Sequence, residues 1–209
     1  TIFDQGRQAD VPVMIGSNAD EATTFDPAIG ATSPIDYVEL HTQFVDLTLG
    51  GDKRKALLLY PDTPEFARDS YIRFNTDANF TQPMRQWANY MDNVSSEVYL
   101  YWWNWRPVIN GSDEYASFHA AEIPYVFGDL AMFNIEVSER EEAFSETMMT
   151  IWTNFAKNSD PSSKGIINWP AYAEDKPMTA VLGAEIKLEG GVRSEQVRVI
   201  TAGYDARRD

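Results

Sequence analysis

Short apolar runs alternate along this chain with longer segments in which apolar residues recur at helical spacing. VPVMIG at residues 11–16 is nearly continuous and ends in Gly, and VYLYWW at 98–103 is a second such run. MTAVLG at 178–183 is followed by EIKLEGG at 185–191, where polar and apolar positions alternate up to a Gly-Gly pair. Continuous apolar runs are typical of parallel strands buried on both faces, and alternation indicates a half-buried strand. We therefore predict two internal strands and a late strand or hairpin.

Helical segments are predicted between these strands, at about 34–49, 53–60, 64–78, 80–93 and 139–157. The last is the clearest, because Ser138-x-x-Glu141 has the form of a capping box. The apolar residues that follow fall on one face and predict core packing: Phe144, Met148, Ile151, Trp152 and Phe155. Strands that alternate with helices indicate an α/β layered architecture, and no linker or internal repeat divides residues 1–209.

Composition narrows the classes of function. The 209 residues are 44% hydrophobic, which is ample for a packed core. The net charge of -15 repels phosphate backbones, so nucleic acid is not expected as a partner. No Cys is present, and no apolar run approaches the roughly 20 residues that span a bilayer, so we expect a soluble chain without disulfides. The sequence leaves a secreted and a cytoplasmic location equally open.

Candidate catalytic side chains follow two of the predicted strands. In α/β sheets, ligands and catalytic groups gather beyond the carboxyl ends of the strands. Acidic residues and one of the two histidines lie in the segments after 11–16 and 98–103: Asp20, Glu21, Asp113, Glu114, His119 and Glu122. A carboxylate and an imidazole that meet at this edge could form the hydrogen bond that orients a general base.

The residues alone also allow simpler interpretations. Glu21 fits the first turn of a helix, where an acid interacts favourably with the helix dipole. His119 fits equally a half-exposed histidine near a helix start. His41, inside a predicted helix with charged neighbours, is expected at the surface. Two histidines without H-x-x-x-H spacing argue against a metal site, and no cofactor is expected.

Four segments, in the right order, resemble the C-terminal part of the type-B carboxylesterases. This family comprises cholinesterases, fungal lipases and bacterial esterases active on p-nitrobenzyl esters. VPVMIGSNADEATTF resembles the family's strand and G-x-N-x-D-E-G segment, and VYLYWWNWRP resembles the strand before its histidine loop. SFHAAEIPYVFGDL matches H-x-x-E-[IL]-P-[YF]-V-F-G, and IWTNFAKNSDPSSKGIINWPAY resembles the helix and W-P-x-Y segment that follow. The absence of the cysteines that form a late disulfide in cholinesterases indicates the microbial branch.

The resemblance implies an α/β-hydrolase fold and a serine esterase mechanism through an acyl-enzyme. Glu21 falls on the family's acid and His119 on its general base. Asp20 is expected to cap a helix or form a salt bridge, and Glu122 to support the loop. Ala22 stands where the family usually has Gly, which puts the local turn in question. Tyr115 and Phe118 are candidates for the substrate pocket.

The G-x-S-x-G elbow and the glycine-rich oxyanion loop of such enzymes are missing from these 209 residues. The resemblance therefore implies an incomplete domain, with helical lid-side residues at about 30–95 and unpaired edges on both apolar strands. We expect a companion polypeptide, the N-terminal fragment or remainder of the same enzyme, that carries the serine. Some relatives of cholinesterases are non-catalytic adhesion or scaffold proteins, and this remains the alternative function.

Overall fold

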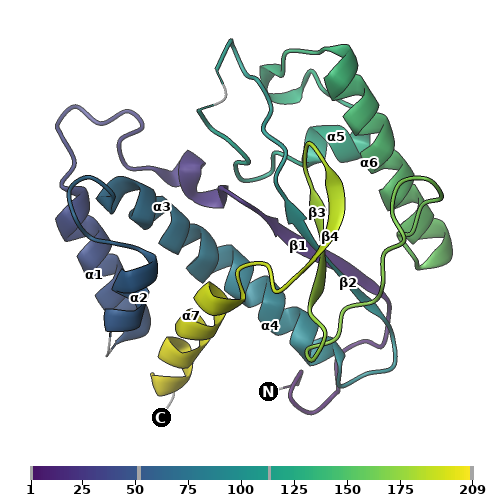
Figure 1. Ribbon diagram of the computed structural model, residues 1–209, viewed down its shortest axis with the longest axis horizontal. Helices are drawn as coiled ribbons and strands as arrows, with labels where there is room; N and C mark the ends of the chain where they lie inside the picture. The colour runs from purple at the N-terminus through teal and green to yellow at the C-terminus, as the bar shows by residue number, and fades with distance from the viewer. Residues whose placement is uncertain (1, 51–52, 113, 208–209) are drawn as a thin grey trace.

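A four-stranded mixed sheet forms the centre of the molecule (Figure 1). The computed structural model describes residues 2–50, 53–112 and 114–207, so Asp113 lies outside the described residues. Strands β1 (Val13–Asn18), β2 (Val98–Trp103) and β3 (Met178–Leu182) are parallel, and β4 (Ile186–Gly190) pairs antiparallel with β3. The spatial order is β1-β2-β3-β4. The predicted α/β architecture and the late hairpin are confirmed.

Helices lie on both faces of the sheet (Figure 1). α5 (Ile123–Phe127) and α6 (Glu139–Asn158) are on one side. α4 (Gln82–Met91) packs on the other and leads to a helical lobe of α1 (Tyr37–Leu49), α2 (Arg54–Leu59), α3 (Ala67–Thr76) and α7 (Ser194–Ala206). A π-helical turn, η2 (Asp77–Thr81), joins α3 to α4, and short 3-10 helices lie at Glu21–Phe25 (η1) and Met132–Asn134 (η3).

Side chains of β2 belong to the apolar core on both faces of the sheet. Tyr99 and Trp103 belong to the apolar cluster under α6, whereas Val98 and Leu100 pack with residues of α4. This division follows from the alternation of side chains along a strand. Because helices cover both faces, the apolar run of β2 needs no polar alternation.

The pairing of the strand edges differs in part from the prediction. β2 is paired on both sides, by β1 and by β3, so the expectation that it would have an unpaired edge is wrong. β3 supplies the missing neighbour through a parallel pairing that local sequence does not reveal. β1 is an edge strand, as expected, and its first residues are only half-buried rather than fully buried.

His41 is a correction to the sequence analysis. The side chain is completely buried, and its Nε2 lies 2.9 Å from the Tyr60 carbonyl oxygen. Its ring meets Phe74 edge to face at 6.0 Å between centroids. Burial lowers the pKa of His41 below its ordinary value. The surface prediction failed because α1 packs between α3 and α7, so a helix face that carries a histidine became interior.

Helix α7 was not predicted, although Val197 and Ile200 are both buried along it at helical spacing.

The capping box predicted at the start of α6 is present only in part. The Ser138 side chain accepts a hydrogen bond from the Glu141 N–H, as predicted. The Glu141 carboxylate instead accepts hydrogen bonds from the Trp105 indole (2.8 Å) and the Tyr125 hydroxyl (2.6 Å).

Candidate active site

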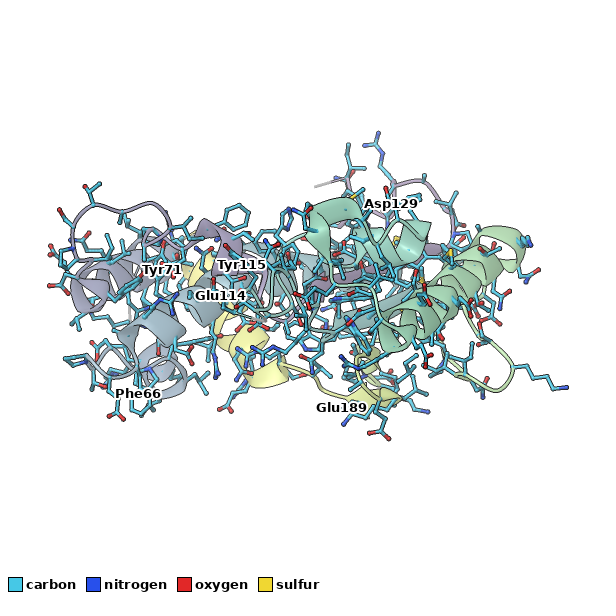
Figure 2. The ribbon with its side chains drawn as sticks, turned by 90° about the horizontal axis from the view of Figure 1, so that it is seen from above. Phe66, Tyr71, Glu114, Tyr115, Asp129 and Glu189 are labelled. Carbon is cyan, nitrogen blue, oxygen red and sulfur yellow. The ribbon has the colours of Figure 1, made fainter. Side chains whose placement is uncertain are left out.

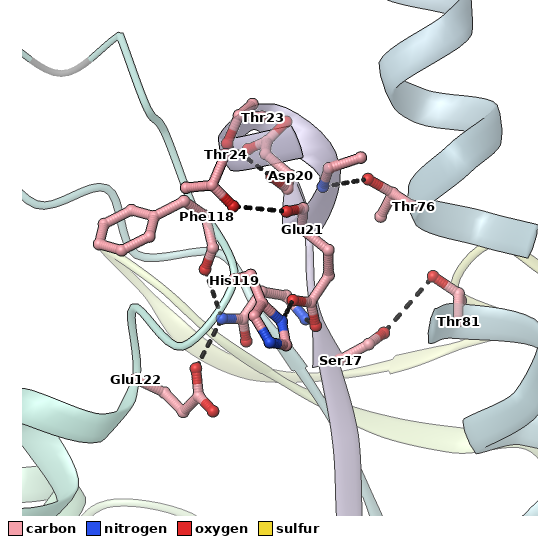
Figure 3. A network of polar contacts seen from close by, with 12 residues as sticks. Ser17, Asp20, Glu21, Thr23, Thr24, Thr76, Thr81, Phe118, His119 and Glu122 are labelled. Atoms are coloured by element: carbon pink, nitrogen blue, oxygen red, sulfur yellow. Dashed lines mark hydrogen bonds and ion pairs between the residues drawn. The ribbon is translucent and has the colours of Figure 1, made fainter. Parts of the chain in front are cut away.

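Glu21 and His119 meet at the carboxyl end of the parallel strands (Figure 3). Oε2 of Glu21 lies 2.7 Å from Nδ1 of His119, a distance typical of a charge-assisted hydrogen bond. Glu21 opens η1, directly beyond β1, and His119 lies in the loop between β2 and α5. The contact expected between the acid and the imidazole is therefore present. Its geometry is that of a carboxylate that orients a general base.

The two partners differ in exposure. The Glu21 side chain is 7% exposed and the His119 side chain 48% exposed. Within the described residues, Nε2 of His119 has no hydrogen-bond partner, and Glu21 is the imidazole's one hydrogen-bonding side chain. An imidazole held at Nδ1 and open at Nε2 can take a proton from, or return it to, a group that approaches from outside.

The Glu21 carboxylate interacts with the Asn18 backbone and with the His119 ring. Its Oε1 accepts the backbone N–H of Asn18 at 2.8 Å. Burial raises the pKa of the Glu21 carboxyl above its ordinary value, and this effect outweighs the Asn18 N–H and His119, which both favour the carboxylate. The negative charge of Glu122 adds to the increase. A carboxylate in this position gains stability when the imidazole becomes protonated.

Two phenylalanines flank the imidazole. Phe25, at the end of η1, and Phe80, in the π-helical turn, stack on each other at 6.2 Å between centroids. Their rings lie 5.5 Å and 5.1 Å from the His119 ring. Phe25 is 51% exposed, so this pair forms an apolar surface beside the open face of the imidazole.

Phe80 was missed by the sequence analysis, because it falls at the start of the helix predicted at about 80–93 and nothing in that pattern relates it to His119. The π-helical turn inserts an additional residue into the helix and rotates the side chains that follow. Thr76, just before this turn, accepts the backbone N–H of Ala22 at 3.1 Å and so joins the helical lobe to η1. The sequence signal nearest to this aromatic pair was the segment VPVMIGSNADEATTF, which resembles the family and ends at Phe25.

The acidic neighbours of the pair have separate contacts. Asp20 was expected to cap a helix or form a salt bridge, but its side chain makes no capping hydrogen bond to η1. Its Oδ2 instead accepts the Ser117 N–H at 3.2 Å, and its own N–H donates to the Ser117 carbonyl at 3.1 Å. Glu122 was expected to support the histidine loop, and its Oε2 accepts the Asn18 side-chain amide at 2.6 Å.

The replacement of Gly by Ala22 does not disturb the turn. Ala22 is completely buried, and it is not among the residues with positive φ. A methyl group is therefore compatible with the local backbone, because only positive φ favours Gly strongly.

The candidate pocket residues do not line the open face of the imidazole. Phe118 is 5% exposed, and its ring points away from His119 (Figure 3). This ring instead contacts the rings of Tyr115 and Phe133, at 6.3 Å and 5.5 Å between centroids. Glu114 and Tyr115 lie together between the helical lobe that carries Tyr71 and the rest of the molecule (Figure 2). They line a polar groove of about 400 Å³ that also includes Arg68, Arg106 and Asp20.

Among the residues that the structure describes, no group of three or more His, Asp or Glu side chains is arranged to hold a metal ion. No helix in the same part of the chain combines the length and apolar character needed to cross a membrane.

This chain is similar in sequence to known carboxylesterases. The profile of the Carboxylesterase family matches residues 1–200. The chain is 30% identical over 197 residues to the para-nitrobenzyl esterase of Bacillus subtilis (strain 168), a match that covers 92% of this chain and 38% of that protein. It is 26% identical over 139 residues to the liver carboxylesterase of Sus scrofa, covering 65% of this chain and 24% of that protein.

The fold of this chain is also similar to solved esterase structures. A PNB esterase structure superimposes with a TM-score of 0.77 at 29% sequence identity, covering 95% of this chain and 40% of that one. The chain thus spans less than half the length of these relatives. With the profile match over nearly all its residues, and with an α/β-hydrolase as its structural neighbour, the chain belongs to the carboxylesterase family.

Proposed function

We propose that this chain supplies the general base and its acid partner to a serine carboxylic-ester hydrolase. The observation that carries the proposal is the 2.7 Å contact between Oε2 of Glu21 and Nδ1 of His119, with Nε2 directed away from that contact. Membership in a family whose named relatives include esterases gives the reaction class. The serine and the oxyanion donors come from polypeptide outside these 209 residues.

In this mechanism His119 acts twice as a proton carrier. Nε2 accepts the serine proton as the serine oxygen attacks the ester carbonyl, and returns it to the departing alcohol. Nε2 then takes a proton from the water that attacks the acyl-enzyme, and it returns this proton to the serine oxygen as the bond to the acyl group breaks and the acid leaves. Glu21 holds the Nδ1–H and stabilises the imidazolium formed in each step. The Phe25–Phe80 surface shields that charged pair from water on one side.

The companion polypeptide is proposed to pair with β1. This strand is parallel to β2 and has one edge that no described strand covers. Parallel strands occur almost only inside sheets, and an uncovered apolar edge promotes aggregation. Val11, two residues before the start of β1, is 52% exposed and would be buried by such a neighbour. A strand that ends in the serine elbow would bring its hydroxyl to the same edge as Nε2.

A labelling experiment tests both parts of the proposal. The purified protein that contains this chain is treated with a fluorophosphonate, and intact mass spectrometry identifies the modified polypeptide. We expect one modified serine outside residues 1–209. The absence of any modified serine would contradict the esterase proposal and favour the non-catalytic adhesion or scaffold alternative.

Substitution of the pair tests the roles of its members. His119→Ala and Glu21→Gln should each lower the turnover of a short p-nitrophenyl ester by about 10³-fold or more. Glu185→Gln is the matched control, because Glu185 is exposed in the β3–β4 turn and its replacement removes the same charge. Turnover at the parental rate in the His119→Ala variant would remove this residue from the mechanism.

A further inference from the structure

The loop that carries His119 has a strained backbone on both sides of the imidazole. Ala116 has φ of 52° and Ala120 has φ of 69°, both in the left-handed region. Such conformations are unfavourable for residues with a Cβ, and they persist only where the surroundings impose them. The local conformational preferences of these residues therefore do not explain the position of His119. It depends on contacts that hold residues 117 and 118 from outside.

Those contacts come mainly from the end of β1. Ser117 exchanges two hydrogen bonds with Asp20, and its hydroxyl donates to the Trp105 carbonyl at 2.8 Å. The Phe118 carbonyl, in the peptide bond directly before His119, accepts the side-chain amide of Asn18 at 2.7 Å. The residue before the imidazole is thus fixed by a strand that lies far away in the sequence.

Asn18 also binds both carboxylates of the site. Its backbone N–H donates to Oε1 of Glu21 at 2.8 Å, and its side-chain nitrogen donates to Oε2 of Glu122 at 2.6 Å. The residue is 2% exposed, so these three bonds are made away from solvent. Figure 3 shows Phe118, Glu21 and Glu122 near His119, with dashed lines at the hydrogen bonds that they accept.

We propose that Asn18 is a positioning residue for the general base, which fixes the acid and the histidine loop relative to each other. The inference rests on the proposed function, because it assigns Asn18 a part in proton transfer by His119. Asn18 does not touch the reacting atoms. It acts through Glu21, by the backbone N–H, and through His119, by the carbonyl of Phe118.

The side-chain chemistry explains why an amide suits this position. Both acceptors are oxygens, one neutral and one a carboxylate, and an Asn nitrogen offers two N–H donors. Asp in the same place would direct a second carboxylate at Glu122 and leave the Phe118 carbonyl without its donor. Ala would leave both acceptors unsatisfied in a buried site, which is costly.

The test uses the complete protein, meaning this chain with its serine-bearing portion. Asn18→Ala should lower kcat for a p-nitrophenyl ester by about 10- to 100-fold, since small misplacements of catalytic groups have effects of this size. KM should stay near the parental value, because Asn18 does not line the open face of the imidazole. Asn168→Ala is the matched control, since Asn168 is exposed and lies outside the site. A parental kcat in Asn18→Ala would overturn the proposal.

A rescue experiment separates positioning from a general loss of folding. Asn18→Asp should reduce kcat further than Asn18→Ala because of its repulsion with Glu122. Adding Glu122→Gln supplies a donor to the new carboxylate, so the double variant should recover kcat about tenfold relative to Asn18→Asp alone. Failure to recover, with both variants folded by circular dichroism, would contradict the assignment.

The outcomes also separate this inference from the proposed function. If the His119→Ala variant hydrolyses the ester at the parental rate, the proposed function is wrong, and so is the role assigned to Asn18. If His119→Ala abolishes hydrolysis while Asn18→Ala and Asn18→Asp retain the parental kcat, only the positioning role is overturned.

Discussion

Oε2 of Glu21 lies 2.7 Å from Nδ1 of His119, although 98 residues separate them in the chain. The contact exists because β1 and β2 are parallel neighbours in register, from Val13 opposite Val98 to Asn18 opposite Trp103. The segments that follow the two strands therefore leave the sheet at the same edge. Helices α1 to α4 lie between β1 and β2 in the chain, and the two side chains are nevertheless in contact.

Glu21 should make folding stability depend on pH in a defined direction. Its pKa is raised by burial, so the folded state binds the proton more tightly than the unfolded state does. The favourable contribution is present below the ordinary pKa of a Glu and is lost as pH rises through the raised value. Glu21→Gln, which cannot ionise, should therefore gain stability relative to the parent as pH rises through this range.

Thermal unfolding of both proteins from about pH 4 to about pH 8 measures this difference. The melting temperature of the variant minus that of the parent should increase with pH and then level off above the raised pKa. Glu185→Gln, at an exposed position, is the control. A difference that decreased with pH would mean that His119 and the Asn18 N–H stabilise the carboxylate more than burial disfavours it.

The Phe25–Phe80 surface should matter for turnover more than for folding. Phe25 is 51% exposed and contacts the imidazole and Phe80 at aromatic distances, a type of contact worth about 0.5–1.5 kcal/mol. We expect Phe25→Ala to reduce kcat/KM by up to about tenfold and to change the melting temperature little. Phe66→Ala is the matched control, because Phe66 is 49% exposed and lies before α3. Equal kinetics in both variants would show that the surface does not take part.

The buried ion pair between Asp77 and Arg193 should be essential for the helical lobe. The Asp77 side chain is 1% exposed, binds Arg193 through both carboxylate oxygens and accepts the Tyr60 hydroxyl at 2.6 Å. Asp77 begins the π-helical turn that carries Phe80. Asp77→Ala leaves the Arg193 charge without its partner, which should lower the free energy of unfolding by about 3–5 kcal/mol.

Urea unfolding measures this cost, with Asp69→Ala as the control. Asp69 forms an exposed pair with Arg73 one helical turn away, and such pairs contribute about 0.3–0.5 kcal/mol. Similar losses in the two variants would show that the Asp77–Arg193 pair is no more important than a surface pair.

Gly16 should not tolerate a side chain. A Cβ at this position would lie 2.4 Å from ring atoms and from the carbonyl oxygen of Tyr101 on the neighbouring strand. Gly16→Ala should therefore destabilise the β1–β2 pairing by about 1–3 kcal/mol or more, and lower activity with it. Gly190→Ala is the control, because its Cβ would meet only Met178 at an ordinary 3.7 Å. Unchanged unfolding of Gly16→Ala in urea would contradict this packing.

The elements that depend on local pattern could be predicted from the residues alone. Three of the four strands were placed within a residue or two, and α6 from 139–157 was found as Glu139–Asn158, because periodicity and helix capping are properties of neighbouring residues. The first strand was shifted, from 11–16 to Val13–Asn18. The resemblance also singled out Glu21 and His119 as partners.

The side chains that surround this pair could not be predicted from the residues alone. Phe80 lies beside His119 because a π-helical turn directs it there, and Asn18 binds the Phe118 carbonyl because β1 and β2 end at one edge of the sheet. His41 became buried because α1 packs inside the helical lobe. These contacts join residues far apart in the chain, and their free energy depends on the packing of whole elements, which no local pattern records.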